Sequence, residues 1–348
     1  MKRVLVTGGA GYIGSHTSLQ LVEAGHQVVV LDNLYSGHRW AVPDQAGFVH
    51  GDIADQALVA DTIQLHQIDA VIHFAGHIVV PESVENPAKY YHNNVVGSLN
   101  LIETCIDCGV GEFVFSSSAA VYGNPNGIPG STSNGGPISE STTLSPINPY
   151  GTSKLITEWT LRDLAAATKG RFRYVALRYF NVAGAHLDGK LGQATPEATH
   201  LIKVACEAAC GIRDGMSIFG DDYPTPDGTC IRDYIHVDDL ARAHLDALDY
   251  MDLDSHAQAA QGIKAGGIEM NCGYGNGYSV KQVIECVKTV SKVDFPVKIE
   301  PPRAGDPPQL VADNSLIRQR LGWNPRYNDL MTICRTAFEW EQALCKQA

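Results

Sequence analysis

Residues 3–14 read R-V-L-V-T-G-G-A-G-Y-I-G, an apolar run followed by a glycine-rich turn. The run Arg3–Thr7 predicts a buried strand, and the apolar periodicity after the turn predicts a helix. The glycines follow the spacing Gly8-x-x-Gly11-x-x-Gly14, a variant of the dinucleotide-binding fingerprint. Without side chains at these positions, the backbone can approach a pyrophosphate at the amino terminus of the helix. An ordinary tight turn would not need this strand–turn–helix context, so the stretch predicts a dinucleotide site.

An acidic residue at the end of the second predicted strand indicates which dinucleotide binds. Asp32 stands 18 residues after Gly14. A carboxylate there accepts hydrogen bonds from a ribose 2′-hydroxyl and repels a 2′-phosphate. The expected cofactor is therefore NAD. Asp52 and Ile53 follow the third predicted strand, where they can reach the adenine.

Strand and helix patterns alternate through the first half of the chain. This alternation is typical of an α/β, Rossmann-type, doubly wound parallel sheet, which binds ligands beyond the carboxyl ends of its strands. Strands are predicted at Arg3–Thr7, Gln27–Leu31, Phe48–His50, Ala70–Phe74, Phe113–Ser116 and Tyr174–Leu177, and helices near Ile13–Glu23, Gln56–Leu65, Pro87–Cys105 and Tyr150–Ala167.

The alternation ends near residue 180, where long Gly/Pro-containing loops separate shorter elements. We predict a smaller α/β carboxy-terminal lobe that closes over the sheet edge and binds the substrate. The NAD-binding Rossmann domain is assigned to residues 1–180, with 229–262 packing back onto it, and the lobe to 181–228 and 263–348.

Composition limits the class of protein. The chain has 348 residues and a net charge of −12, which argues against nucleic acid or an anionic membrane as partner. No apolar run reaches the roughly 18 residues of a membrane span, and the first apolar run is too short for a signal peptide. The nine scattered cysteines predict reduced, cytoplasmic thiols. The histidines and cysteines lack compact ligand spacing, so no metal is expected.

A candidate catalytic set follows two later strands. Tyr150 and Lys154 are four residues apart and share one face of a predicted helix. Free tyrosine titrates near pH ~10, but a neighbouring ammonium would lower the pKa of Tyr150 and make it a usable general base. This spacing alone is common on helices. Ser118, in the run S-S-S-A-A that follows the strand at Phe113–Ser116, completes a Ser/Tyr/Lys set.

With these residues the chain resembles the extended short-chain dehydrogenase/reductase superfamily and, more narrowly, its UDP-galactose (UDP-glucose) 4-epimerase family. The resemblance covers nearly the whole chain, and its later stretches are the most specific because the fold and glycine loop are shared widely. The matching stretches are Gly8–His16, Leu31–Leu34, His73–Gly76, Glu82–Val84, Asn93–Asn94, Ser116–Gly123, Pro149–Lys154, Arg178–Asn181, Gly220–Gly228, Ile231–Val237 and Arg303–Asp306.

The resemblance implies a redox cycle that regenerates its own cofactor. Tyr150, as phenolate, would take the proton of the sugar 4-hydroxyl while hydride passes from C4 to NAD. Lys154 would hold the phenolate and bond the nicotinamide ribose, and Ser118 would bond the 4-oxygen. The 4-keto sugar then turns over, and hydride returns to its opposite face. NAD must therefore stay tightly bound.

The resemblance also implies the binding residues. Arg232 and Arg303 would bind the pyrophosphate, although Arg232 could instead form an ion pair with Asp233. Phe219 would stack on uracil unless it belongs to the core. The expected cofactor contacts are Gly8, Gly11, Tyr12, Ile13, Gly14, Asp32, Asn33, Asp52, Ile53, Phe74, Ala75, Gly76, Asn93, Ser116, Tyr150, Lys154 and Tyr179. The expected substrate contacts are Ser118, Tyr150, Asn181, His200, Leu201, Phe219, Arg232, Arg303, Asp306 and Leu310.

Several positions depart from the family pattern. His77 stands where better-known bacterial members carry a lysine, and the G-S-T-S-N-G-G stretch at Gly130–Gly136 indicates an inserted surface loop. At Leu310 the family places the residue that sets the size of the sugar pocket. Leucine is intermediate in size there, so UDP-N-acetylglucosamine and UDP-N-acetylgalactosamine are candidate further substrates.

Three alternatives to a hexose epimerase remain at this stage. A UDP-pentose (xylose/arabinose) 4-epimerase differs little in sequence. A nucleotide-sugar 4,6-dehydratase would need an Asp-Glu pair where this chain has Ala119 and Ala120. A non-enzymatic NAD sensor would not need the Ser/Tyr/Lys set. By analogy, the helices near Pro87–Cys105 and Tyr150–Ala167 would pair across a two-fold axis in a homodimer.

Overall fold

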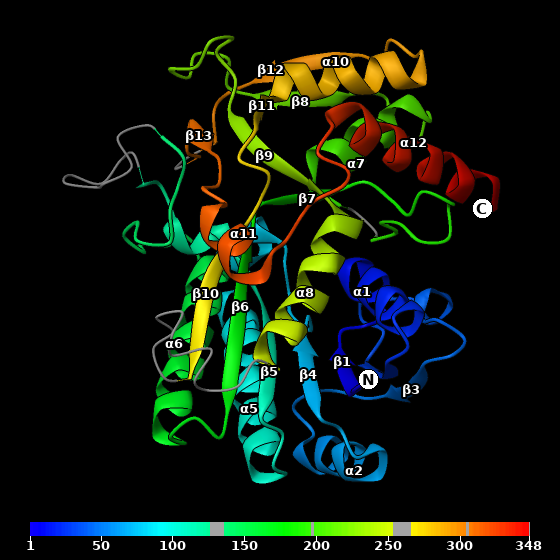
Figure 1. Cartoon of the computed structure of the whole chain (residues 1–348). Coiled ribbons are helices and arrows are strands. Elements are labelled where there is room, and N and C mark those ends of the chain that lie inside the picture. Colours follow the sequence, from blue (N-terminus) through cyan, green and yellow to red (C-terminus); the bar gives the residue numbers. More distant parts are fainter. Residues whose placement is uncertain (126–135, 196–197, 253–265, 304–305, 348) are drawn as a thin grey trace.

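A parallel sheet forms the base of the molecule (Figure 1). The computed structural model describes residues 1–125, 136–195, 198–252, 266–303 and 306–347, and within them this sheet has seven strands in the order β10-β6-β5-β4-β1-β2-β3. The strands are β1 (Arg3–Thr7), β2 (Gln27–Asp32), β3 (Gly47–His50), β4 (Ala70–His73), β5 (Glu112–Ser118), β6 (Arg173–Tyr179) and β10 (Gly267–Cys272). The direction of winding reverses between β1 and β4, the switch point at which such folds bind ligands. The predicted doubly wound α/β fold is confirmed.

Helices cover both faces of this sheet. Successive strand residues point to opposite faces. Val4 and Val6 therefore pack in the buried cluster that includes α1 and α8, whereas Leu5 packs in a second cluster with α2, α5 and α6. Burial on both sides explains why the strands are apolar at nearly every position. These helices are α1 (Tyr12–Glu23), α8 (Val237–Met251), α2 (Gln56–His66), α5 (Ser98–Asp107) and α6 (Pro149–Ala167).

The helical stretch predicted at Pro87–Cys105 contains a change of helix type. After α3 (Val80–Glu85), it comprises α4 (Pro87–Tyr90), a π-helical segment η2 (Tyr91–Gly97) and α5. Such π-turns are often found at functional sites. Here the side chain of Asn94 accepts a hydrogen bond from the His77 amide at 2.8 Å and donates to the Ser153 hydroxyl at 3.1 Å. The π segment thereby ties the chain after β4 to the first turns of α6.

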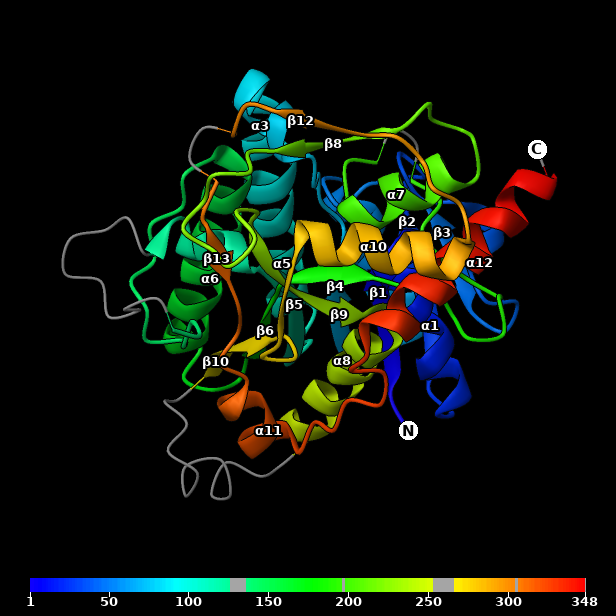
Figure 2. The same cartoon turned by 90° about the horizontal axis from the view of Figure 1, so that it is seen from above.

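The smaller lobe sits over one end of the large sheet (Figures 1 and 2). In it, β9 pairs with β7, β11 and β13, while β8 pairs with β12. Its core is continuous with the sheet, because Ile202 and Ile333 of the lobe share a buried cluster with Val4. The lobe contains β7 (Asn181–Ala183), α7 (Leu201–Ala209), β8 (Met216–Phe219), β9 (Ile231–His236), β11 (Gly277–Ser279), α10 (Val280–Ser291), β12 (Val297–Glu300), β13 (Gln309–Leu310) and α12 (Leu330–Gln347), with α11 (Ser315–Leu321) reaching back to α8.

The seventh strand of the large sheet comes from a segment that was predicted to belong to the lobe. Residues 263–348 were assigned there, but β10 pairs with β6 in parallel, from Gly267 opposite Tyr174 to Cys272 opposite Tyr179. The segment G-I-E-M-N-C has few apolar residues, and its partner strand lies far away in the sequence. Only the tertiary pairing identifies it. The predicted loop at Gly130–Gly136 lies, except for Gly136, outside the described residues.

In the described ranges, no helix is both long and apolar enough to span a membrane.

A buried histidine makes the fold sensitive to acid. His244 on α8 donates from Nδ1 to the Leu240 carbonyl oxygen at 2.8 Å, and its ring packs on Phe74. Burial lowers the pKa of His244 to about 4. Because the unfolded chain binds a proton below pH ~6.5 and the folded chain does not, this group lowers the free energy of unfolding as pH falls from ~6.5 to 4. We expect His244→Phe to reduce that fall by up to ~1.4 kcal/mol per pH unit, measured by urea denaturation between pH 7 and 4.5. An unchanged pH slope would contradict a neutral buried imidazole.

Candidate active site

A cavity of about 1160 Å³ lies where the loops after β1, β2, β4 and β5 meet the smaller lobe. Every residue predicted to contact cofactor or substrate lines it, including Phe219, Arg303 and Leu310 from the lobe. Segments that are distant in the sequence therefore share one site. The roles of the individual residues remain predictions.

The glycines of the loop after β1 pack closely against neighbouring backbone, which leaves no room for side chains. Gly8 has φ +71°, and a side-chain carbon there would lie 2.5 Å from the Ala75 nitrogen. A side-chain carbon at Gly14 would lie 2.3 Å from the Gly8 carbonyl oxygen. Helix α1 begins just beyond, and its N-cap Gly11 offers no side-chain cap. Its first amides are thus available to an anion, which fits the pyrophosphate of a dinucleotide.

Asp32 ends β2 beside this loop. Its carboxylate accepts hydrogen bonds from the Ala10 amide at 2.9 Å and from the Leu34 amide at 2.8 Å. These bonds hold the buried carboxylate next to the glycine loop. At the following residue, the Asn33 side chain donates to Asp52 at 2.7 Å. An acidic group fixed here fits a ribose 2′-hydroxyl and opposes a 2′-phosphate, so the residues present fit NAD.

The candidate catalytic residues converge from β5 and α6. Helix α6 begins with Pro149, and its N-cap Asn148 accepts a hydrogen bond from the Gly151 amide at 2.8 Å. A side-chain carbon at Gly151 would lie 2.6 Å from the Ala120 carbonyl oxygen, so the helix packs closely on the chain after Ser118. This approach brings Tyr150 into hydrogen-bonding contact with Ser118.

Lys154 contacts the end of β5 rather than the phenol oxygen. Its Nζ donates to the Ser116 carbonyl oxygen at 2.8 Å and lies 6.0 Å from the centroid of the Tyr150 ring. The hydroxyl of Tyr179 hydrogen-bonds that of Ser116. Hydrogen bonds therefore link Lys154, Ser116 and Tyr179 on the cavity wall, next to the Tyr150 ring.

The predicted lowering of the pKa of Tyr150 by Lys154 is not the dominant effect in the structure. Burial raises the pKa of Tyr150, and the hydrogen bond with Ser118 only partly opposes this. Burial also lowers the pKa of Lys154 to about 8, while Glu158 raises it. Helical spacing places both groups on one face, but it says nothing about their dehydration, which disfavours both charged forms.

A buried ion pair that the sequence did not predict joins α6, the helix of Tyr150 and Lys154, to the large sheet. Arg178 on β6 donates to Glu158 on α6 through Nε at 2.9 Å and Nη2 at 2.6 Å. Both side chains are almost fully buried. Arg178 also donates to the Tyr122 hydroxyl at 3.0 Å, which in turn donates to Asn271 of β10 at 2.7 Å. No sequence signal marks this pair, because its partners come from different elements.

In the lobe, the predicted substrate residues are paired with one another. The guanidinium of Arg303 lies 3.9 Å from the centroid of the Phe219 ring. Phe219 is 38% exposed, so it does not belong to the core. Arg232 pairs with Asp306 at 2.6 Å. The alternative pairing of Arg232 with Asp233 is wrong, because the Asp233 carboxylate is buried and accepts backbone amides, including that of Tyr274 at 2.9 Å.

A family model described as the NAD dependent epimerase/dehydratase family matches residues 4–260. The chain belongs to this family. A UDP-glucose 4-epimerase from Azospirillum brasilense is 51% identical over 342 residues, which cover 98% of this chain and 92% of that relative. The crystal structure of UDP-glucose 4-epimerase from Brucella ovis in complex with NAD has a TM-score of 0.88 and 46% identity, covering 98% and 99% of the two chains. The UDP-Glc/GlcNAc 4-epimerase from Campylobacter jejuni has a TM-score of 0.82 and 49% identity, covering 99% and 100%. The resemblance inferred from the sequence is confirmed.

Some residues that line the cavity were not predicted from the sequence as cofactor or substrate contacts. The centroid of the His77 ring lies 4.9 Å from that of Tyr35 and 5.6 Å from that of Tyr90. Gln193, Arg213, Met216 and Cys230 also line the cavity but belong to no motif. Within the described residues, no group of three or more His, Cys, Asp or Glu side chains could hold a metal ion.

The buried ion pair yields a prediction about stability. Glu158→Gln would leave the Arg178 guanidinium buried without its counter-ion, so we expect a loss of roughly 3–5 kcal/mol in the free energy of unfolding. Arg335→Ala removes an exposed pair with Glu339 and should cost less than ~1 kcal/mol. Urea denaturation of both variants at pH 7.5 provides the measurement. Equal losses would mean that the pair does not support α6.

Proposed function

We propose that this protein interconverts UDP-galactose and UDP-glucose as an NAD-dependent 4-epimerase. The observation that carries the proposal is the joining of three groups in one cavity of about 1160 Å³: the bare glycine loop, the set Ser118, Tyr150 and Lys154, and the arginines of the lobe. The glycine loop suits a dinucleotide, and the Ser/Tyr/Lys set suits proton transfer at a hydroxyl. The arginines suit a diphosphate. The three named relatives, at 46–51% identity, are all described as 4-epimerases of UDP-glucose.

In this proposal the Ser/Tyr/Lys set performs the proton transfer. Tyr150 takes the proton from the sugar 4-hydroxyl and later returns it, and Ser118, already bonded to Tyr150, holds the 4-oxygen. Lys154, whose Nζ donates to the Ser116 carbonyl oxygen, stabilises the phenolate by its positive charge. NAD, when bound, accepts the hydride from C4 and returns it, and its nicotinamide ring adds the positive charge that favours a phenolate. The 4-keto sugar must turn over between the two transfers.

The lobe would grip the nucleotide by exchanging its internal pairs. The substrate diphosphate would replace Asp306 as the partner of Arg232, which leaves Asp306 for a ribose hydroxyl. Arg303 covers the Phe219 ring in the structure, on a face that uracil could take. Asn181, His200 and Leu201 complete this wall of the cavity. A firm hold on the nucleotide leaves the sugar free to turn.

Two narrower statements belong to the same proposal. We infer a cytoplasmic homodimer, since the cysteines of the described segments are free thiols and Val96 and Trp159 are half-exposed on η2 and α6, the predicted dimer elements. We propose the predicted division into two domains with one change, in which β10 joins the first domain because it pairs with β6. Ala119 and Ala120 disfavour a dehydratase, and a UDP-pentose epimerase remains the main alternative.

Epimerase activity is tested by proton NMR of the purified protein with UDP-galactose and no added cofactor. We expect UDP-glucose to form until an equilibrium mixture is reached, because NAD is resident. Tyr150→Phe, which removes the base, should lower kcat by on the order of 10²–10⁴-fold. Normal turnover by Tyr150→Phe would overturn the assigned role of Tyr150. No turnover of UDP-galactose even with added NAD would overturn the hexose assignment and favour a UDP-pentose.

N-acetylated sugars are a second substrate class, favoured by Leu310 and by the 49% identical UDP-Glc/GlcNAc 4-epimerase. Leu310 lines the cavity and packs against the apolar cluster that contains Ala119, Phe180 and Ala312. We expect the wild-type chain to turn over UDP-N-acetylglucosamine, and Leu310→Tyr to lower that kcat/KM at least ~10-fold by filling the pocket, about 1.4 kcal/mol. The kcat/KM for UDP-galactose should change less than ~3-fold. Equal losses for both sugars would mean that this position does not select for the C2 substituent.

A further inference from the structure

The segment after β2 lies flat on the glycine loop. The His38 amide donates to the Ala10 carbonyl oxygen at 2.9 Å, and a side-chain carbon at Gly37 would lie 2.8 Å from the Ala10 carbonyl carbon. The short helix η1 (Arg39–Ala41) follows, and the Arg39 guanidinium lies 4.7 Å from the centroid of the Phe48 ring on β3. This segment therefore belongs to the first domain.

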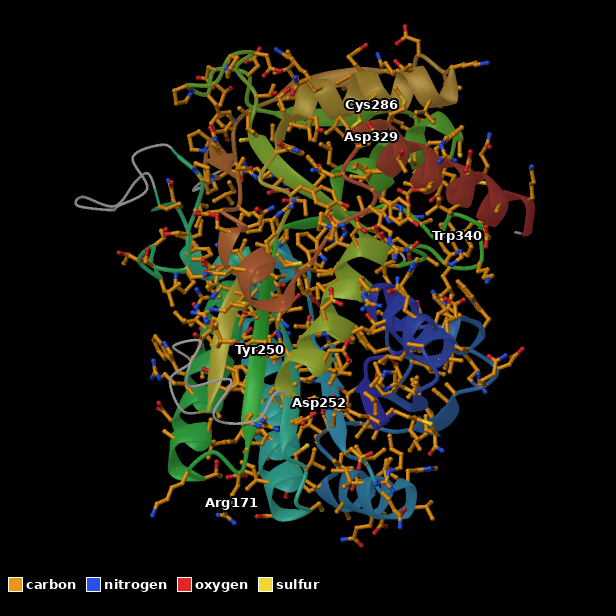
Figure 3. The ribbon with its side chains drawn as sticks, viewed as in Figure 1. Arg171, Tyr250, Asp252, Cys286, Asp329 and Trp340 are labelled. Atoms are coloured by element: carbon orange, nitrogen blue, oxygen red, sulfur yellow. The ribbon has the colours of Figure 1, made fainter. Side chains whose placement is uncertain are left out.

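A segment of the lobe rests on Trp340 of α12. A side-chain carbon at Gly192 would lie 2.4 Å from Cγ of the indole, so the backbone lies directly against the ring. The indole Nε1 donates to the Gln193 carbonyl oxygen at 3.2 Å. Figure 3 labels Trp340 on the side of α12 nearest the first domain. This second segment thus belongs to the lobe.

Aromatic rings join the two segments. The Trp40 ring lies 5.2 Å from that of His38, nearly parallel to it, and 5.8 Å from that of Trp340. His38 Nε2 also donates to the Ala194 carbonyl oxygen at 3.2 Å. We call His38, Trp40 and Trp340 the aromatic clasp.

The clasp stands at the rim of the dinucleotide half of the cavity. Ser36 and Gly37, on its first-domain side, line the cavity, and so do Gln193 and Thr195 on its lobe side. The glycine loop, where the pyrophosphate would lie, is directly bonded to the clasp segment through Ala10. The clasp therefore joins the two segments beside the glycine loop, at the rim of the cavity.

We propose that the aromatic clasp retains NAD, and that its opening limits the rate of NAD release. The inference rests on the proposed function, because a cycle that regenerates its cofactor gains nothing from releasing it. Trp40 is 53% exposed and Trp340 is 7% exposed, so the contact sets a surface ring against a buried one. Such a contact can open without unfolding the chain. None of the three clasp residues lines the cavity, so turnover with saturating NAD should not depend on them.

The test measures NAD release without any sugar. The purified holoprotein is mixed with excess isotope-labelled NAD, and exchange of the bound cofactor is followed over time. We expect Trp40→Ala to speed release at least about 10-fold, corresponding to about 1.4 kcal/mol, and His38→Ala, which also loses the bond to Ala194, to do so as well. Trp40→Phe keeps a stacked ring and should stay within about 3-fold of wild type.

Met331→Ala, at an exposed position on the same helix as Trp340, is the matched control and should leave release unchanged. Melting temperatures of all variants verify folding. Wild-type release rates in both Trp40→Ala and His38→Ala would overturn the proposal. A wild-type chain that loses its NAD on gel filtration would overturn it too, whereas the NMR assay with added NAD would still decide the epimerase assignment separately.

Discussion

The ion pair between Arg178 and Glu158 is the interaction on which the rest of the site depends. It lies almost fully buried between β6 and α6, where neither charge can be left without the other. The pair holds α6 in position over the sheet. Tyr150 and Lys154 come from the first turns of that helix, and Ser116 and Ser118 come from the neighbouring strand β5. Their mutual geometry is therefore a consequence of how α6 is fixed.

The pair is also the centre of a wider network. Ser117 of β5 donates to Glu158, and Tyr122 connects Arg178 to Asn271 of β10. Asn271 donates in turn from its side chain to the Ile138 carbonyl oxygen at 2.7 Å. Polar groups in such a network have all their partners only when every member is in place. The network thus links the edge strand of the large sheet to α6 at the floor of the candidate site.

The two walls of the cavity are built differently from this floor. On the side predicted to bind the cofactor, the tightly packed glycines and the hydrogen-bonded carboxylate of Asp32 line the cavity, and the proposed aromatic clasp lies at its rim. On the lobe side, Arg232 and Asp306 neutralise each other, and Arg303 stacks on Phe219. Both pairs line the cavity and are only partly buried. Under the two proposals, firm retention of the cofactor and reversible binding of the substrate would have separate structural origins.

The sequence by itself determined those features of this protein that depend on local residue patterns. The strand–glycine–helix unit, Asp32 at a strand end and the four-residue spacing of Tyr150 and Lys154 depend on neighbouring residues, so they could be predicted with the doubly wound fold. The family resemblance extended this to the residues of the lobe. Other features depend on contacts between distant segments: β10 in the large sheet, the partner of Arg178, the aromatic clasp and the pairing of Arg232 with Asp306. The pKa directions of Tyr150 and Lys154 also follow from dehydration. Tertiary structure alone decided these, because long-range pairing and burial leave no periodic or local signal in the chain.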